Sequence, residues 1–596
     1  MNLNRRDFLA ATSLLSLPSE EIWSLLTPWN SPISGRPGLL VTSTDWASLP
    51  ERRKADPDLD RFAAALIDRA RRDISLPVLE RKLTGRRLLG VSREFIRRGL
   101  QWSFAFRVSG DRQFLERAVQ EMSGVAAFAD WHPDHYLDVA EMTTGMAISY
   151  DWLFNDLSSS DRTVFRSAII DKGIAQARLG HRTFRMTNNW NQVCIGGMVL
   201  GALAVEDDQP ALASDLLKAA QKEVFTGLDA YRPDGVYPEG PAYWSYGTAY
   251  SILLIAALRG AKGTDWGVLA APGFRRSAEF YAQSIGPSGK HFDFADGGEG
   301  QELPCAIVYL ARELGQTAFL NSKRAMIRNK QGVADRFAPL SILWWPTDSK
   351  AGEASPRFSG QGPQPLAIWR SSWSDPNALW FGIKAGGAAH NHAHMDAGSF
   401  VLDMDGIRWA RDLGSQDYNS LESRGIDLWN MKQGSSRWQV FRISADSHNT
   451  ITVDNQPHSA TGMASLRMVD ENEALIDMTP VFLPGTLRKA NRRARFANDF
   501  VQLDDELQGL NPSSKVRWAM TTDAEISIDG KQALLSVKGK RLNIRFEGEG
   551  IKLEVLDISA PRHDFDAANP NMRQLLVTGQ PGPDGTWKLG TRFSRS

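Results

Sequence analysis

One change in the spacing of apolar residues, near Pro346, constrains the fold of this chain more than any other feature. From about residue 45 to 345 the apolar residues recur at helical spacing, and no strand-like run separates the segments. Beyond residue 364, short runs alternate apolar with polar residues, as strands do. Helices grouped before strands predict an α+β multidomain chain rather than a parallel sheet with crossover helices.

The helical segments follow one another as hairpins without a strict repeat period, which favours a toroid over a regular array. The segment 192–205 is apolar on nearly every face and is expected to be an inner helix. Further helices are expected at 61–71, 92–108, 111–127, 137–153, 160–179, 209–225, 249–259 and 274–285.

The second half is expected to form a sandwich of antiparallel sheets, because its strands are short and separated by turn signals. We place the helical domain at residues 26–349, a linker rich in Gly, Pro and Ser at 350–364, and the β-sandwich at 365–596. Strands are expected at 380–383, 400–404, 450–454, 500–504, 526–528, 533–537, 542–546 and 551–555.

Composition narrows the function classes. The formal net charge is zero, so no global basic field predicts nucleic-acid binding, although a local basic cleft for an acidic substrate is compatible with it. Cys194 and Cys305 are the only cysteines, which excludes a disulfide framework. Arg5 and Arg6 precede a short apolar run, so residues 1–25 predict a twin-arginine export signal and a periplasmic or secreted protein without membrane insertion. The alternative is a plain basic N-terminus.

A histidine-rich stretch at 389–400 holds three of the ten histidines. The turn Asp405-Gly406 predicts a hairpin directly after it, whose paired positions sum to about 811. Asp412 would then lie opposite Ser399, near His394, and His448 would join them if the strand that follows it enters the same sheet. His, Asp and His with one open position fit zinc. The alternative is a set of hydrogen-bonded sheet residues.

Two further stretches offer polar groups. Asn188, Asn189 and Asn191 begin the apolar helix, where they either cap it or form a pocket for a carboxylate. Residues 233–247 form an aromatic loop held by Gly and Pro, in which Tyr243 is the first candidate for catalysis and Tyr246 the second. Aromatic residues at this density are also typical of a core or of a platform on which sugars stack.

In order and spacing, five segments resemble the heparinase II/III-like polysaccharide lyases, which include some alginate lyases. The segments are the asparagine stretch, 239–243, 392–396, 411–414 and 447–450, and the likeness extends over about residues 90–460. It implies an incomplete (α/α) toroid followed by antiparallel sheets, with the active cleft between them. One departure concerns Trp190, where several family members have histidine.

The resemblance implies roles for individual residues. Tyr243 and His392 would be catalytic, and Asn189 would neutralise the substrate carboxylate. His394, Asp412 and His448 would hold a structural zinc. The remaining cleft positions are expected to bind substrate, namely Asn188, Trp190, Asn191, Glu239 and Tyr246.

The predicted activity is β-elimination on a uronic-acid-containing polysaccharide, in which Asn neutralises the carboxylate while Tyr and His transfer the proton. A glycoside hydrolase is the alternative, with Glu239 and either Asp234 or Asp138 as its two carboxylates. A non-catalytic polysaccharide-binding protein is the third possibility. The sequence predicts neither the polymer nor the oligomeric state.

Overall fold

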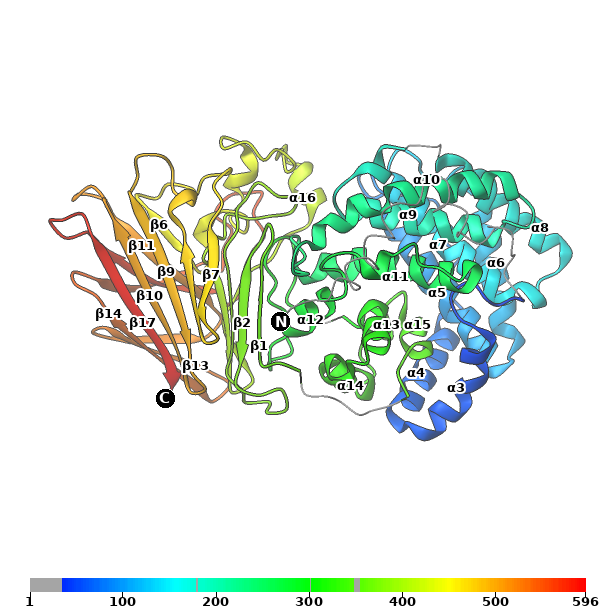
Figure 1. Ribbon diagram of the computed structural model, residues 1–596, viewed down its shortest axis with the longest axis horizontal. Helices are drawn as coiled ribbons and strands as arrows, with labels where there is room; N and C mark the ends of the chain where they lie inside the picture. Colours follow the sequence, from blue (N-terminus) through cyan, green and yellow to red (C-terminus); the bar gives the residue numbers. More distant parts are fainter. Residues whose placement is uncertain (1–34, 178–180, 301, 348–353) are drawn as a thin grey trace, which may run out of the picture.

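The computed structural model describes residues 35–177, 181–300, 302–347 and 354–596, and divides into a helical part and a β part that lie side by side (Figure 1). The predicted export signal lies outside the described residues. No described helix has both the length and the apolar character needed to cross a membrane. The helical part contains α3 (Ser43–Ala55), α4 (Pro57–Asp73), α5 (Leu89–Ser109), α6 (Arg112–Ala126), α7 (Tyr136–Leu153), α8 (Ser159–Ala168), α9 (Asn189–Ala204), α10 (Pro210–Leu228), α11 (Gly240–Lys262), α12 (Ser277–Gln283), α13 (Cys305–Leu314), α14 (Asn321–Arg328) and α15 (Ala338–Leu343).

The helices form an inner row and an outer row, as predicted for a toroid. Helices α5, α7, α9 and α11 contact one another in this order, while α6, α8 and α10 pack outside them. Every residue of α7 is buried, and α9 is the predicted inner helix. A Cβ at Gly197 would lie 2.4 Å from the Ala140 carbonyl oxygen, and one at Gly196 would lie 2.8 Å from that of Tyr250. Glycine therefore lets α9 approach both neighbours closely.

The β part contains three antiparallel sheets, which confirms the predicted class. A five-stranded sheet has the order β1-β2-β3-β4-β5, an eight-stranded sheet the order β12-β13-β14-β17-β10-β9-β8-β7, and a four-stranded sheet the order β15-β16-β11-β6. The strands are β1 (Arg357–Gly360), β2 (Leu366–Arg370), β3 (Trp380–Lys384), β4 (Phe400–Met404), β5 (Ile407–Ala410), β6 (Ile451–Val453), β7 (Ser465–Asp470), β8 (Glu473–Asp477), β9 (Lys489–Phe496), β10 (Phe500–Gln508), β11 (Val516–Thr522), β12 (Glu525–Asp529), β13 (Gln532–Val537), β14 (Lys540–Glu547), β15 (Lys552–Asp557), β16 (Arg573–Gly579) and β17 (Trp587–Arg595).

The five-stranded sheet belongs to two hydrophobic cores. Ile368 and Trp380 are part of the core of the helical part. Trp369 and Phe381, the next residues along the same strands, are part of the core between the sheets. Strands β2, β3 and β4 are consequently buried at every residue, because neighbouring side chains point to opposite faces. This sheet fixes the β part against the toroid.

Two local predictions need correction. Strand β1 lies inside the segment predicted to be a linker, where Phe358 packs against Phe280 of the helical part. The Gly, Pro and Ser content of 350–364 hid this short alternation.

The predicted hairpin exists, but its register changes within a few residues of the turn. Met404 pairs with Ile407 and Asp403 with Arg408, whereas Leu402 pairs with Ala410 across a β-bulge. The bulge shifts the pairing by one residue, so Asp412 does not lie opposite Ser399. Strand β6, which follows His448, joins the four-stranded sheet and not that of the hairpin.

Candidate active site

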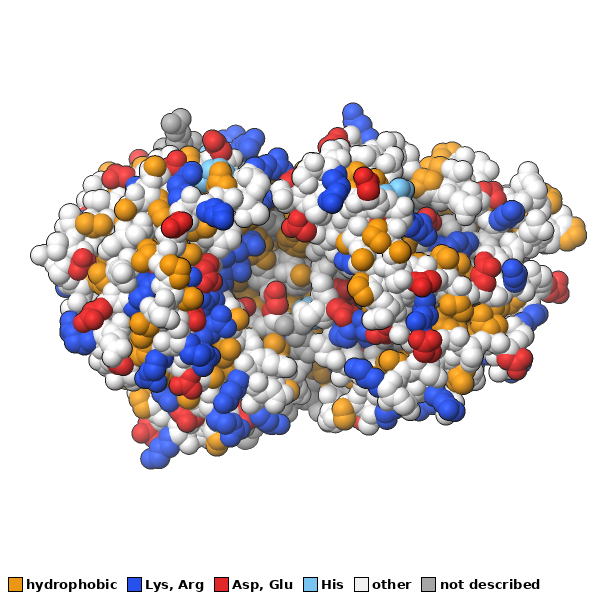
Figure 2. Space-filling view, turned by 180° about the vertical axis from the view of Figure 1, so that it is seen from behind, with side chains coloured by type: hydrophobic (Ala, Val, Ile, Leu, Met, Phe, Trp, Pro, Cys, Tyr) orange, Lys and Arg blue, Asp and Glu red, His pale blue; other side chains and the backbone are white. Residues whose placement is uncertain are grey.

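A cleft of about 1270 Å³ runs between the helical part and the β part. Figure 2 shows the molecule hollowed between its two lobes. Both lobes contribute polar and aromatic side chains to this cleft, and five arginines line it. These are Arg86, Arg87, Arg93, Arg182 and Arg336.

Tyr243 lies in the first turn of α11, one turn of helix before Tyr246. Both residues were predicted to lie in a loop. The helix already begins at Gly240, because Pro241 is compatible with a first helical turn. The hydroxyls of Tyr243 and Tyr418 are 2.7 Å apart, and Tyr418 belongs to α16 (Tyr418–Glu422) of the β part. Burial raises the pKa of the Tyr243 phenol and the charge of Asp296 adds to this, so the phenol is protonated in the free protein.

His392 lies against Tyr243, with the ring centroids 4.1 Å apart and the rings nearly parallel. Its Nδ1 is 2.6 Å from Oδ2 of Asp296, to which Tyr418 also donates a hydrogen bond of 2.9 Å. Its Nε2 lies 3.9 Å from Glu239. His392 has a φ of +61°, a left-handed conformation that is uncommon outside glycine and that turns the ring into the cleft.

Asp296 connects His392 with His394. Its Oδ1 is 2.9 Å from Nε2 of His394, while its Oδ2 faces His392. Burial opposes ionisation, but the hydrogen bonds from the two histidines outweigh it and hold the pKa of Asp296 well below its usual range. The carboxylate therefore orients the catalytic candidate and the predicted metal ligand together.

Glu239 holds two amides from opposite sides of the cleft. It accepts a hydrogen bond of 2.7 Å from Nδ2 of Asn189 on α9 and one of 3.2 Å from Nδ2 of Asn391. Burial raises the pKa of Glu239, and the charge of His392 and the two amides act in the opposite direction. Each amide nitrogen has a second N–H, which remains for a ligand.

The other predicted substrate-binding residues have different surroundings. Asn188 caps α9 by accepting the Trp190 N–H, and both residues line the cleft. Tyr246 also lines it, but its hydroxyl donates to Glu141 at 2.8 Å. Asn191 was predicted to bind substrate, but it is buried and does not line the cleft. Its Nδ2 donates to the carbonyl oxygens of Phe184 and Glu223.

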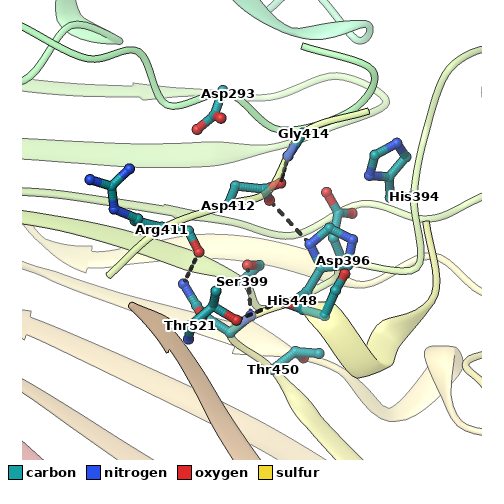
Figure 3. Close-up of polar contacts among 12 residues, drawn as sticks. Asp293, His394, Asp396, Ser399, Arg411, Asp412, Gly414, His448, Thr450 and Thr521 are labelled. Atoms are coloured by element: carbon teal, nitrogen blue, oxygen red, sulfur yellow. Dashed lines mark hydrogen bonds and ion pairs between the residues drawn. The ribbon is translucent and has the colours of Figure 1, made fainter. Parts of the chain in front are cut away.

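The three predicted metal ligands come together, although the register that suggested them was wrong. His394, Asp412 and His448 are buried and offer ligand atoms within 4.8 Å of one another (Figure 3). Nδ1 of His394 and Nε2 of His448 are buried and have no hydrogen-bond partner among the described residues. Burial opposes both charges, yet their mutual attraction lowers the pKa of Asp412 and raises that of His448. Two imidazole nitrogens and a carboxylate fit the donor set that zinc prefers.

Three residues beside His392 were not predicted from the sequence, namely Asp296, Tyr418 and Trp429. Asp296 precedes two glycines and has the signature of an ordinary turn. Tyr418 and Trp429 lie in a segment without periodicity, and their rings contact His392 with centroids 6.1 and 5.5 Å away. The sequence offered one signal for Asp296, a carboxylate directly before Gly297 and Gly298.

The fold of this chain is similar to that of solved polysaccharide lyases. Heparinase III has a TM-score of 0.60 at 13% identity, covering 100% of this chain and 92% of that one. Heparan sulfate lyase HepC from Pedobacter heparinus has a TM-score of 0.56 at 15% identity, covering 87% and 78%. The chondroitin AC lyase of Streptomyces coelicolor A3, in complex with chondroitin sulphate, has a TM-score of 0.52 at 12% identity, covering 93% and 82%.

Residues 367–590 match the family Heparinase II/III-like, C-terminal. The match lies within the β part, and the predicted resemblance is confirmed. The solved structures add the fold of the whole chain, a helical toroid followed by antiparallel sheets. No curated protein matches the sequence at a significant level.

Proposed function

We propose that this protein is a polysaccharide lyase that cleaves a uronic-acid-containing polysaccharide by β-elimination. The observation that carries the proposal is the hydrogen-bonded group of Tyr243, Tyr418, Asp296 and His392 beside a cleft that Asn189 also lines. The lyases that share its fold support the reaction class.

The first requirement of this reaction is neutralisation of the substrate carboxylate, because the C5 proton is hardly acidic beside a full negative charge. The second N–H of Asn189 and that of Asn391 are donors for the carboxylate oxygens, with Glu239 fixing both amides. Nε2 of His392, whose Nδ1 is held by Asp296, faces the same place. Oriented donors of this kind stabilise the charge that develops on the enolate-like intermediate.

The second requirement is proton transfer. In the free protein Tyr243 is protonated and hydrogen-bonded to Tyr418, which contacts both Asp296 and Nδ1 of His392. Transfer of the Tyr243 proton to Tyr418, together with transfer of the Tyr418 proton to Asp296, would make Tyr243 a base for C5 of the bound sugar, and both protons shift back once the leaving oxygen has been protonated. The same phenol then returns a proton to the leaving glycosidic oxygen, so one residue serves both steps of a syn elimination.

We also propose a structural zinc held by His394, Asp412 and His448. The metal would tie the segment before β4, the segment after β5 and the segment before β6 together. It would act at a distance from the substrate, by fixing the loop that presents His392 and by holding His394, which contacts Asp296. For Arg5 and Arg6 we propose export of the folded protein to the periplasm or beyond.

The carboxylates named for a hydrolase have other partners. Asp234 accepts the Gln361 N–H and pairs with Arg276. Asp138 is buried, accepts the Leu88 N–H, and faces His132. Neither is paired with Glu239 across the cleft, and this favours the lyase over the hydrolase.

The test is a screen of alginate, heparin, heparan sulfate, hyaluronan and chondroitin for the ultraviolet absorbance of a new unsaturated uronate. We expect one of them to give that product, and Tyr243→Phe to abolish it while polymer binding and melting temperature are kept, because only the phenolic oxygen is lost. New reducing ends without the absorbance would show a hydrolase. Binding without either product would show a non-catalytic protein, and near-normal turnover by Tyr243→Phe would exclude this tyrosine as acid or base.

A further inference from the structure

Two arginines flank Tyr246 in the wall of the cleft. Arg93 comes from α5, and Arg336 lies two residues before the start of α15. Their guanidinium carbons lie 4.7 and 5.4 Å from the centre of the Tyr246 ring. The side chain of Arg93 is 39% exposed and that of Arg336 is 23% exposed, so both positive charges reach the cleft.

A single buried carboxylate, Glu141, holds this cluster. Glu141 is completely buried and accepts hydrogen bonds from Nε of Arg93 at 2.9 Å and from the hydroxyls of Tyr246 and Tyr250 at 2.8 Å each. Nε of Arg336 forms an ion pair with Glu141 at 3.6 Å, but the Arg336 guanidinium makes no hydrogen bond among the described residues. One carboxylate therefore serves two guanidinium groups, and most of their N–H donors are unused.

The cluster lies next to the group that performs the proposed reaction. Tyr246 follows Tyr243 by three residues on α11, so the two side chains are neighbours on one face of the helix. The positive charge of Arg93 is one of the influences that lower the pKa of Tyr243 against the effect of burial. Both arginines also line an adjoining hollow of about 430 Å³.

Three further acidic residues line this hollow. Glu94 pairs with Arg97 and Arg98, and the other two also have partners of their own. Glu302 accepts a hydrogen bond of 2.8 Å from the Ser245 hydroxyl, and Asp335 accepts one of 2.8 Å from the Phe337 N–H. Burial raises the pKa of Asp335 to about 6, and the charge of Arg336 acts against this. None of the three carboxylates forms an ion pair with Arg93 or Arg336 among the described residues, so the two guanidinium groups remain open to an anion from solution.

We propose that Arg93 and Arg336 form an anion-binding subsite, which takes a sulfate or carboxylate group of a sugar beside the one on which Tyr243 acts. The inference rests on the proposed function. A guanidinium fork matches the geometry of both anions, and charge-assisted hydrogen bonds are about twice as strong as neutral ones. Glu141 pairs with both arginines, and both guanidinium groups lie over the Tyr246 ring.

The decisive variant is Arg336→Gln, because Glu141 retains its hydrogen bonds from Arg93, Tyr246 and Tyr250 and the fold is least disturbed. We expect KM for the cleaved polymer to rise at least tenfold while kcat changes by less than threefold. Added salt should raise KM less in the variant than in the wild type, since one screened contact is gone. Arg93→Lys retains the charge but loses the fork, and should give an intermediate KM.

Arg107→Gln is the matched control. Arg107 lies in the last turn of α5, the helix that carries Arg93, and stacks over Trp46 outside the cleft. Its KM should equal that of the wild type. The subsite is overturned if Arg336→Gln keeps its melting temperature and its KM, or if only kcat falls. A KM rise on heparan sulfate but not on its unsulfated backbone identifies sulfate as the ligand, and an equal rise on both identifies a carboxylate.

Failure of the lyase activity would be recognised separately. If the wild type cleaves none of the polymers, calorimetric binding of heparan sulfate and alginate oligosaccharides to the wild type and to Arg336→Gln still tests the subsite. Binding by the wild type that Arg336→Gln weakens tenfold sustains the subsite without the lyase. Absence of binding, or equal binding by both proteins, rejects it.

Discussion

Replacing Asp296 by asparagine tests the hydrogen-bonded group more directly than replacing the tyrosine. The change keeps the size of the side chain and removes its charge. The Asp296 carboxylate forms hydrogen bonds with His392 at 2.6 Å and with Tyr418 at 2.9 Å. A hydrogen bond to a charged group contributes about 1.5–3 kcal/mol. Loss of two such bonds removes about 3–6 kcal/mol, if both are needed only in the transition state. This corresponds to a fall in kcat of about 10²- to 10⁴-fold.

The assay is initial-rate kinetics by ultraviolet absorbance, with KM and kcat determined separately. We expect KM to stay within about threefold of the wild type, because Asn189 and Glu239 keep their contacts. Asp296→Glu should recover part of kcat, since it restores the charge at a different reach. A kcat within threefold of the wild type for Asp296→Asn, in protein with an unchanged melting temperature, would refute the role we assign to this carboxylate.

Two further predictions concern the metal and export. Purified wild type should contain about one equivalent of zinc, and His394→Ala should lose most of it and melt at a lower temperature, because metal that binds only the folded state stabilises that state. His392→Ala should keep the zinc and the melting temperature but lose turnover, and the opposite pattern would exchange the two roles. Changing Arg5 and Arg6 to Lys should leave the protein in the cytoplasm, and an unchanged periplasmic yield would show that this segment is not a twin-arginine signal.

The fold class could be predicted because it depends on local periodicity. The apolar helix that became α9 and the alternating runs of the β part carry their structure in neighbouring residues. The bulge between β4 and β5 could not be predicted, since it depends on tertiary packing and leaves no mark on the spacing around Asp405-Gly406. The three candidate zinc ligands nevertheless lie together, because their residue types and order are informative without the register.

The candidate site was predicted only in part, for reasons that differ from residue to residue. Helical geometry could have separated Asn189 from Asn191, because residues two apart on a helix do not share a face. Tyr246 does share the face of Tyr243, but nothing local shows that its hydroxyl is held by Glu141, 105 residues earlier in the chain. Tyr418 and Asp296 come together across 122 residues through the docking of the two parts.

The five-stranded sheet, whose two faces belong to different cores, limits how this architecture can be recombined. A chimaera that joined this toroid to the β part of a distant relative would bring foreign side chains against the surface that Ile368 and Trp380 now fill. The exchanged half could fold correctly and still present His392 at the wrong distance from Tyr243. Because both parts line the cleft, a functional exchange has to transfer the helical part and the β part together, including the five-stranded sheet that joins them.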